Sequence, residues 1–321
     1  MGKKLRVAMI GAGNLSTSVH YPSLDVLEDV EIAAVSELDE ARMNKAREQF
    51  KIPKGYKDYK AMIEEVAPDA VYLVMPPQIL FPHALRCLEM GVNLFIEKPP
   101  GLTVDQTRHL ARKAESKGLV TMCGFQRRHA PLVVPALEEA RRRGGVDLVV
   151  ASFYKWYDDS SAYFNGEVDI LTSDCIHAVD LIRYAGGEVK QVASDVRNRR
   201  HDYPNFFTAL ITFESGATGV LLGNWSAGAR FFTCEIHARA YTSFINVEVE
   251  ARSHSENGAE PLVVKAAAAA GGDEMFKRGG FLNQNRVFMD CVREKGQPPN
   301  SIPDSVKSME LVERIYREVM K

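Results

Sequence analysis

A pair of glycines between an apolar run and a helical stretch is the feature that most limits how this chain can fold. Residues 5–10 (LRVAMI) form an apolar run typical of a buried strand, and Gly11, Ala12 and Gly13 follow it directly. In a strand–turn–helix unit, the first glycine makes a tight turn and the second lets the backbone approach a pyrophosphate. Ser16 stands where a third small residue lets helix and strand pack closely. The pattern predicts a dinucleotide site at the edge of a parallel sheet.

The chain up to residue 125 alternates short apolar runs with helical stretches. Strands are expected at residues 31–36, 70–74, 92–96 and 119–124, and helices at residues 40–50, 59–66, 83–90 and 104–117. Alternation of strand and helix is typical of a doubly wound α/β sheet. We therefore predict a dinucleotide-binding domain over residues 1–125.

The end of the second strand indicates which dinucleotide is bound. The strand ends at Ser36, and Glu37 follows at the distance from the glycines where an acidic residue holds the ribose hydroxyls of the adenosine. No Arg or Lys is adjacent to Glu37 to receive a 2′-phosphate, so the sequence favours NAD over NADP. The alternative is that Glu37 or Asp39 caps the next helix, and for Asp39 the cap is the better interpretation.

A lysine follows the strand expected at residues 92–96. Ligands of parallel sheets bind at the carboxyl ends of the strands, so Lys98 is placed at the binding edge. Pro99 restricts the backbone of the lysine to extended values. The alternative is a solvated loop charge. Pro76 and Pro77 end an earlier strand, where the chain is expected to pass under the cofactor.

From residue 126 the pattern changes to runs typical of an antiparallel or mixed sheet. Strands are expected at residues 146–156, 189–197, 206–213, 218–225, 231–238 and 242–250, and helices at residues 132–143, 283–294 and 304–318. The alanine-rich residues 265–272 are expected to form a surface loop. We predict a second, α+β domain over residues 126–321, with a mostly antiparallel open sheet covered on one face by helices.

The aromatic content of this second sheet predicts self-association. Its aromatic residues supply more surface than one layer of helices is expected to cover, which favours a homodimer or homotetramer through the open face. They are Phe206, Phe207, Trp225, Phe231 and Phe232.

A helical stretch between the first two strands of the second domain carries three polar residues at three-residue spacing. Asp174, His177 and Asp180 fall on one stripe, so a carboxylate can hold the imidazole in one tautomer and raise its basicity. The alternative is structural, with Asp174 capping the helix and His177 buried in a hydrogen bond.

Composition excludes several classes of partner. With 40 Lys+Arg and 42 Asp+Glu, the formal net charge is -2, so no overall field attracts nucleic acid or an anionic membrane. No apolar stretch is long enough to span a bilayer. The five cysteines are isolated and have no metal-type spacing, so we expect no metal, reduced thiols and a cytoplasmic location.

The glycine loop, the Glu97-Lys98-Pro99 stretch and the helix over residues 174–180 resemble, in order and separation, the motifs of the Gfo/Idh/MocA oxidoreductase family. The resemblance covers essentially the whole chain. It implies a Rossmann domain, a carboxyl-terminal mixed-sheet domain, and NAD(P)-linked oxidation or reduction of a sugar, cyclitol or nucleotide sugar. One position departs from the family pattern, because Ser173 stands where the family has its catalytic Asp, four residues before the His.

The resemblance also implies roles for individual residues. His177 is expected to take the proton of the substrate hydroxyl, Asp174 to orient the imidazole, and Lys98 to lie beside the same oxygen. Two alternatives stay open: a non-catalytic protein of this fold that senses NAD or a sugar, and an NAD-dependent glycosidase. The residues expected to bind the cofactor are Gly11, Ala12, Gly13, Asn14, Leu15, Ser36, Glu37, Pro76, Pro77, Glu97 and Lys98.

Overall fold

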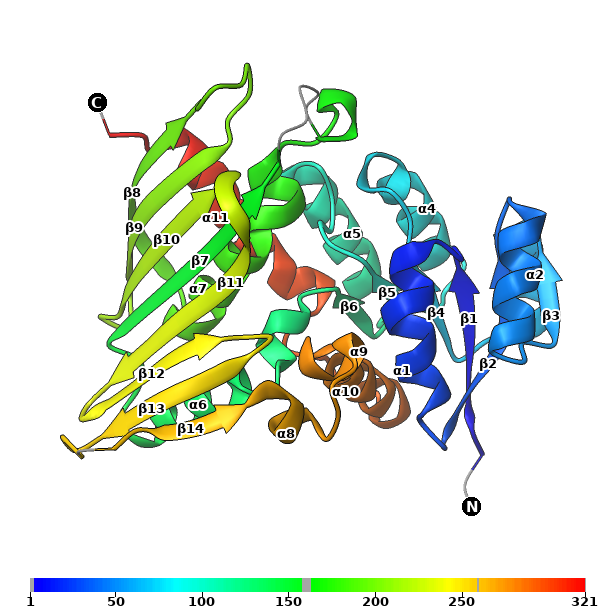
Figure 1. The fold of residues 1–321 in the computed structure, drawn as a ribbon. Helices are drawn as coiled ribbons and strands as arrows, with labels where there is room; N and C mark the ends of the chain where they lie inside the picture. The colour runs from blue at the N-terminus through cyan, green and yellow to red at the C-terminus, as the bar shows by residue number, and fades with distance from the viewer. Residues whose placement is uncertain (1–2, 158–162, 259, 321) are drawn as a thin grey trace. The chain divides into compact units, whose positions relative to one another are not determined.

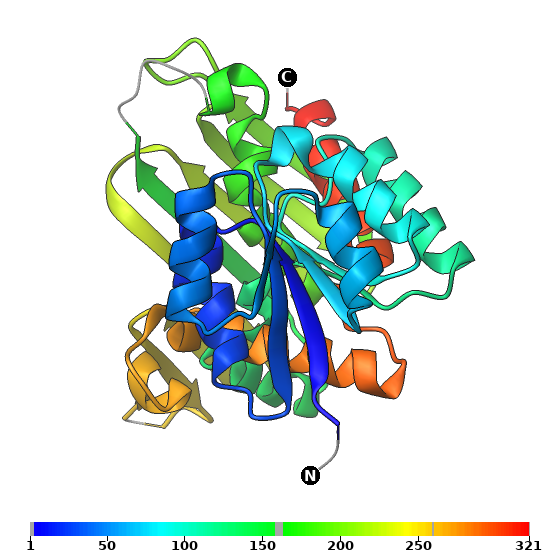
Figure 2. The same cartoon turned by 90° about the vertical axis from the view of Figure 1, so that its right-hand side faces the viewer.

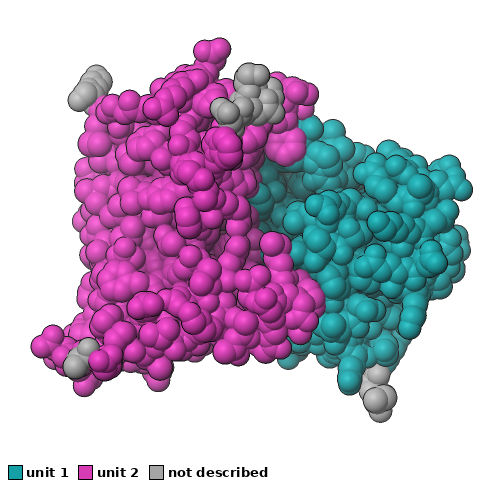
Figure 3. Space-filling view, in the orientation of Figure 1, with its two compact units in different colours: residues 1–125, 281–306 teal, residues 126–280, 307–321 magenta. Residues whose placement is uncertain are grey.

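The computed structural model describes residues 3–157, 163–258 and 260–320. The chain divides into two compact units (Figure 3): unit 1 comprises Met1–Phe125 and Phe281–Val306, and unit 2 comprises Gln126–Gly280 and Lys307–Lys321. Within the described ranges, no helix has both the length and the apolar character needed to cross a bilayer.

Unit 1 is built on a parallel sheet of six strands in the order β3-β2-β1-β4-β5-β6 (Figures 1 and 2). Every neighbouring pair is parallel. The order reverses at β1, whose neighbours are β2 and β4, so the loop after β1 lies at the point where such sheets bind ligands. The predicted doubly wound sheet is confirmed. Its strands are β1 (Leu5–Ile10), β2 (Val30–Ser36), β3 (Lys54–Tyr56), β4 (Ala70–Leu73), β5 (Asn93–Ile96) and β6 (Thr121–Cys123).

Helices flank this sheet, and its central strands are buried on both faces. Tyr72 and Phe95 pack against α1, α2 and α10 in one core, and the intervening Val71 and Ile96 are also fully buried. Helix α4 begins at its first-turn proline and not at residue 83 as predicted, because proline is favoured in the first turn of a helix. The helices of unit 1 are α1 (Tyr21–Asp25), α2 (Glu40–Gln49), α3 (Tyr59–Val66), α4 (Pro77–Glu89), α5 (Val104–Ser116) and α10 (Phe281–Glu294).

Helix α10 belongs to unit 1, although it lies far beyond residue 125 in the sequence. The ring of Phe288 lies 5.6 Å from that of Tyr72 and 5.8 Å from that of Phe95. The side chain of Asn300 donates to the Cys123 carbonyl at 2.6 Å, and the Cys123 N–H donates to the Asn300 carbonyl at 2.8 Å. The sequence predicted a second domain over residues 126–321, but residues 281–306 belong to unit 1. The reason is that α10 supplies the apolar cover for one face of the parallel sheet.

Unit 2 contains a sheet of eight strands in the order β14-β13-β12-β11-β7-β10-β9-β8 (Figure 1). All neighbouring pairs are antiparallel except β7 with β10, so the predicted mostly antiparallel sheet is confirmed. The strands are β7 (Leu148–Trp156), β8 (Val189–Arg197), β9 (Phe206–Phe213), β10 (Thr218–Asn224), β11 (Ser226–Ala238), β12 (Tyr241–Asn246), β13 (Glu250–Ser255) and β14 (Leu262–Lys265).

Helices cover one face of this second sheet. Helix α7 contacts β7 and β10, and α6 contacts β11 and β12. A Cβ atom at Gly219 of β10 would lie 2.5 Å from a methyl group of Ile182, so glycine permits the close approach of α7. The helices are α6 (Val133–Arg142), α7 (Ile176–Gly186), α8 (Ala266–Ala270), α9 (Met275–Arg278) and α11 (Ile302–Arg317), which begins in unit 1 and ends in unit 2.

The segment after β12 differs from the sequence prediction. Strands β13 and β14 were not predicted, and residues 265–272 are not a loop, because they contain the end of β14 and helix α8. Alanine has the highest helix propensity, and Gly271, with φ of 65°, ends α8 in the left-handed conformation. The local composition that resembled a loop is a short capped helix.

The aromatic residues of the second sheet lie mainly on its covered side. Phe207, Trp225 and Phe232 are buried, whereas Phe231 is 47% exposed. The expectation that all of these side chains form excess apolar surface is therefore wrong, because successive strand residues point to opposite faces. The open face carries Leu210, Phe231 and Phe244, which are each about half exposed.

Candidate active site

The loop after β1 has the backbone geometry that a dinucleotide requires. Gly11 has φ of 102°, and a Cβ atom there would lie 2.1 Å from the Val74 carbonyl oxygen, so only glycine fits. At Gly13 no atom lies within 4 Å of the position of a Cβ, which leaves the backbone open to a ligand. Ser16 is buried and its hydroxyl donates to the Gly13 carbonyl at 3.0 Å. The residues present therefore fit a pyrophosphate group at this loop.

Glu37 lies directly beside this loop. Its carboxylate accepts a hydrogen bond from the Ala12 N–H at 2.9 Å and another from the Asp39 N–H at 3.1 Å. The Gly11 N–H donates to the Ser36 carbonyl at 2.9 Å, which joins the end of β2 to the same loop. Asp39 caps α2 by accepting from the backbone of the first turn, as predicted for that residue.

A cation near Glu37 was missed by sequence reasoning, which considered only adjacent residues. The guanidinium of Arg42 lies 4.0 Å from the Glu37 carboxylate and 3.2 Å from that of Asp39, because the first turn of α2 returns it toward the strand end. Arg42 and Lys45 line a cavity of about 370 Å³ together with residues of the glycine loop and the turn after it. The lining residues are Ala12, Asn14, Thr17, Ser18, Arg42, Lys45, Ala46 and Gln49.

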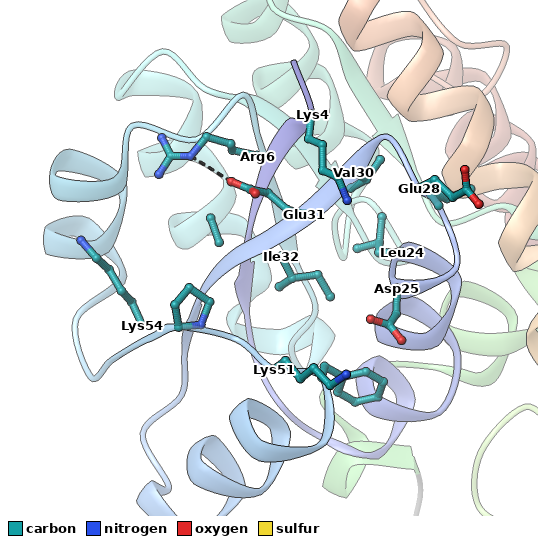
Figure 4. Close-up of a pocket in the computed structure, with 14 residues that line it drawn as sticks. Lys4, Arg6, Leu24, Asp25, Glu28, Val30, Glu31, Ile32, Lys51 and Lys54 are labelled. Atoms are coloured by element: carbon teal, nitrogen blue, oxygen red, sulfur yellow. Dashed lines mark ion pairs between the residues drawn. The ribbon is translucent and has the colours of Figure 1, made fainter. Parts of the chain in front are cut away.

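A second cavity, of about 800 Å³, lies at the amino-terminal ends of β1 and β2 (Figure 4). Charges of both signs line it, and Arg6 is paired with Glu31 at 3.4 Å. Because ligands of parallel sheets bind at the carboxyl ends of the strands, this cavity is not the cofactor site.

Lys98 emerges half-buried at the carboxyl end of β5, as predicted, and the Lys98–Pro99 peptide bond is cis. Glu97 was predicted to contact the cofactor, but it is 4% exposed, and the contacts described for it are with His20 and Lys98. Its carboxylate lies 2.9 Å from the imidazole of His20 and accepts from the Lys98 N–H at 3.1 Å. His20 was not predicted as a functional residue. The sequence shows it as a single histidine in the helical stretch after the glycine loop, with no pattern around it. Pro76 and Pro77 lie at the start of α4.

In unit 2, Asp174 and His177 lie on consecutive helical turns. Asp174 is part of a π-helical turn, Leu171–Cys175, and the buried His177 is in the first turn of α7. Asp174 is ion-paired with Lys155 of β7 and accepts from the Tyr163 hydroxyl at 3.3 Å. That hydroxyl in turn accepts from the Trp225 indole N–H at 2.7 Å.

The Lys155, Asp174, Tyr163 and Trp225 network was not predicted. Burial and the Asp174 carboxylate raise the pKa of Tyr163, so its hydroxyl stays protonated and can donate. Ser173, the residue at the position of the family's catalytic Asp, is buried beside Asp174.

Asp180, the third polar residue of the predicted stripe, is structural. Its carboxylate binds the guanidinium of Arg128 through two bonds of 2.7 and 2.5 Å and accepts from the Ser308 hydroxyl at 2.7 Å. Asp180 and Arg128 side chains are 1% and 0% exposed. Among the residues that the structure describes, no group of three or more His, Cys, Asp or Glu is placed to hold a metal ion.

The sheet order, the glycine loop at the switch point and the carboxylate beside it define unit 1 as a Rossmann domain that binds a dinucleotide. Residues 5–125 match the model of the oxidoreductase family with an NAD-binding Rossmann fold, and residues 137–241 match the GFO/IDH/MocA C-terminal domain. The chain belongs to the GFO/IDH/MocA family and is an NAD(P)-dependent oxidoreductase.

Similar proteins agree with this assignment. D-apiose dehydrogenase of Paraburkholderia graminis is 24% identical over 98% of this chain and 87% of its own length. Myo-inositol 2-dehydrogenase of Thermotoga maritima is 26% identical over 68% of this chain and 67% of its own length. The structure of levoglucosan dehydrogenase with NADH and levoglucosan has a TM-score of 0.86 at 18% identity, and the match covers 98% of this chain and 97% of that one.

Proposed function

We propose that this chain transfers a hydride between NAD and a secondary alcohol or ketone of a sugar, cyclitol or nucleotide sugar. The observation that carries the proposal is Lys98 at the carboxyl end of β5, on the same edge of the sheet as the glycine loop after β1. Apiose, myo-inositol and levoglucosan, which name the three similar proteins, are all polyhydroxylated, and they support this substrate class.

The proposed chemistry needs a group that moves the hydroxyl proton. When bound, the nicotinamide exchanges the hydride with the substrate carbon. We assign the proton to His177, assisted by Asp174 as its orienting carboxylate, and we assign to Lys98 the polarisation of the substrate oxygen. The burial of His177 supports its role. Asp174 lies one helical turn before His177, and its carboxylate is bound by Lys155 and Tyr163.

A substrate panel tests this function. Polyols, sugars and nucleotide sugars are incubated with NAD or NADP, and reduction is followed at the nicotinamide absorbance. Steady NADH production on a member of the panel is the expected result. Release of a sugar without net NADH production would identify a glycosidase, and neither reaction would favour a sensor of NAD or a sugar.

We also propose a homo-oligomer that associates through the open face of the second sheet. Leu210, Phe231 and Phe244 are each about half exposed, and they lie on the same side of the sheet, on β9, β11 and β12, with β10 and β7 between β9 and β11. Val220 and Val150 lie between Leu210 and β11 on this face, and exposed apolar side chains gathered on one face favour association.

We propose the cytoplasm as the place of action. All five cysteines are free, and four of them are buried. Burial raises the pKa of Cys87 and Cys234 to about 12, which keeps these thiols protonated at neutral pH. Full labelling of the thiols in the unfolded protein, without prior reduction, is the expected result.

A further inference from the structure

The buried pair of His20 and Glu97 in unit 1 has no part in the chemistry described above. The imidazole Nε2 lies 2.9 Å from the Glu97 carboxylate, and the two side chains are 0% and 5% exposed. Titratable groups so far from water need specific partners, because an unpaired buried charge is costly. The pair joins residues that are 77 positions apart in the sequence.

Each partner is fixed by close packing. The ring of His20 lies 5.1 Å from Phe95, 5.7 Å from Phe281 and 5.9 Å from Tyr72, measured between ring centroids. Nδ1 has no hydrogen-bond partner among the described residues, so the geometry assigns the proton to Nε2, which donates to Glu97.

On the other side, Glu97 packs against the backbone at the end of β6. A Cβ atom at Gly124 would lie 2.5 Å from the Glu97 carboxylate, so glycine is needed to leave room for it. The second carboxylate oxygen of Glu97 accepts from the Lys98 N–H at 3.1 Å. The same carboxylate therefore holds both an imidazole and the backbone of the lysine.

His20 reaches Glu97 from the segment that follows the glycine loop. It closes a π-helical turn, Ser16–His20, whose first residues are tied to the loop. The Ser16 and Thr17 hydroxyls each donate to the Gly13 carbonyl at 3.0 Å. A π-helical turn shifts the side chains that follow it relative to an ordinary helix, and such turns are frequent at functional sites.

We propose that His20 and Glu97 form a positioning pair, which fixes the backbone of Lys98 relative to the glycine loop. The contacts run without a break from the Gly13 carbonyl through the π-helical turn to His20, Glu97 and the Lys98 N–H. His20 is a positioning residue and touches neither substrate nor cofactor. The inference rests on the proposed role of Lys98.

The test compares His20→Phe, which keeps a ring but loses the donor, with His20→Gln, whose amide can again donate to Glu97. His20→Phe is expected to lower kcat by roughly 10- to 100-fold, since small misplacements of a reacting group cost that much. It should also speed hydrogen exchange of the Lys98 amide and leave the Kd for NAD unchanged. His20→Gln should recover most of the rate and of the amide protection.

Gly124→Ala is an independent variant, because it displaces the Glu97 carboxylate without removing a polar group. If His20→Phe does not fold, kcat and the Lys98 amide exchange rate of Gly124→Ala test the proposal instead. Phe288→Leu is the matched control: it weakens the core near the same rings, so it lowers Tm but should leave kcat unchanged.

Three results would overturn the proposal. They are equal kcat in His20→Phe and Phe288→Leu at equal Tm, no recovery in His20→Gln, or an unchanged exchange rate at the Lys98 amide. If the wild-type protein oxidises no member of the substrate panel, the proposed function fails, and the exchange rate of the Lys98 amide alone still decides whether the pair positions this backbone.

Discussion

At the residue scale, Lys98 and His177 are the side chains on which the proposed reaction depends. Lys98→Ala and His177→Ala should each lower kcat by roughly 10²- to 10⁴-fold, the usual contribution of a positioned acid or base. The Kd for NAD should change little, because neither residue is assigned to hold the dinucleotide. Steady-state rates and calorimetric titration with NAD measure the two effects, and Lys117→Ala, at the exposed end of α5, is the control.

The double variant gives a second test of the same roles. If both groups serve one proton transfer, the combined loss is much smaller than the product of the single losses. A solvated Lys98 would be neutral to remove, and a purely structural His177 would lower Tm instead of kcat. Either outcome would remove that residue from the catalytic set.

Glu37 is expected to make NAD the preferred dinucleotide. A 2′-phosphate beside its carboxylate meets a like charge, which should cost on the order of one to a few kcal/mol in a partly desolvated site. Glu37→Gln should raise the affinity for NADP, and the gain should be smaller in Glu37→Gln combined with Arg42→Ala, because Arg42 is the cation within 4.0 Å. Calorimetry with both dinucleotides measures this, and equal wild-type affinities would exclude Glu37 from the site.

At the scale of elements, α7 is anchored by Asp180. Asp180→Asn removes the charge that Arg128 requires in a fully buried pair, and breaking such pairs costs about 3–5 kcal/mol of unfolding free energy. Denaturant unfolding measures the loss. Asp195→Asn is the matched control, because Asp195 pairs with Arg197 at the surface and such pairs contribute about 1 kcal/mol or less. Similar losses in the two variants would contradict the assigned role of Asp180.

Asp29 binds two arginines of α10, and the stability that this contact provides is expected to depend on pH. Hydrogen bonds from Arg286 and Arg293 lower the pKa of Asp29 from 3.8 to about 2. A carboxylate with a lowered folded-state pKa stabilises the fold above its unfolded pKa, and this stabilisation is lost as pH falls toward 2. The difference in unfolding free energy between wild type and Asp29→Asn should be full at pH 6, shrink as pH falls below 3.8, and be mostly lost at about pH 2. A constant difference across this range would contradict the linkage.

At the scale of the whole molecule, self-association is expected to depend on the open face of the second sheet. Phe231→Glu combined with Phe244→Glu should convert the oligomer to a monomer in light scattering, because charges on that face would be costly to bury. Val26→Glu, a change at an exposed apolar residue of unit 1, should leave the mass unchanged. A wild-type protein that is already monomeric at micromolar concentration would exclude the proposal.

Features with a local signal in the sequence could be predicted. Gly11 marks a turn that no side chain can enter, Glu37 follows its strand directly, and Lys98 follows the last residues of β5. Most strands of both units could also be predicted, because an apolar pattern with a period of two, or an unbroken apolar run, is recognised from neighbouring residues alone.

Pairings between residues far apart in the chain could not be predicted without the fold. His20 with Glu97, Arg128 with Asp180, and α10 with the first sheet join segments that are 77, 52 and more than 150 positions apart. The residues around each partner show no pattern that predicts the pair. A buried histidine or arginine meets its partner because of the strand order and the packing of helices on the sheet. The same reason explains why Asp174 was expected to serve His177 while its ion pair with Lys155, 19 positions away on β7, became visible only in the fold.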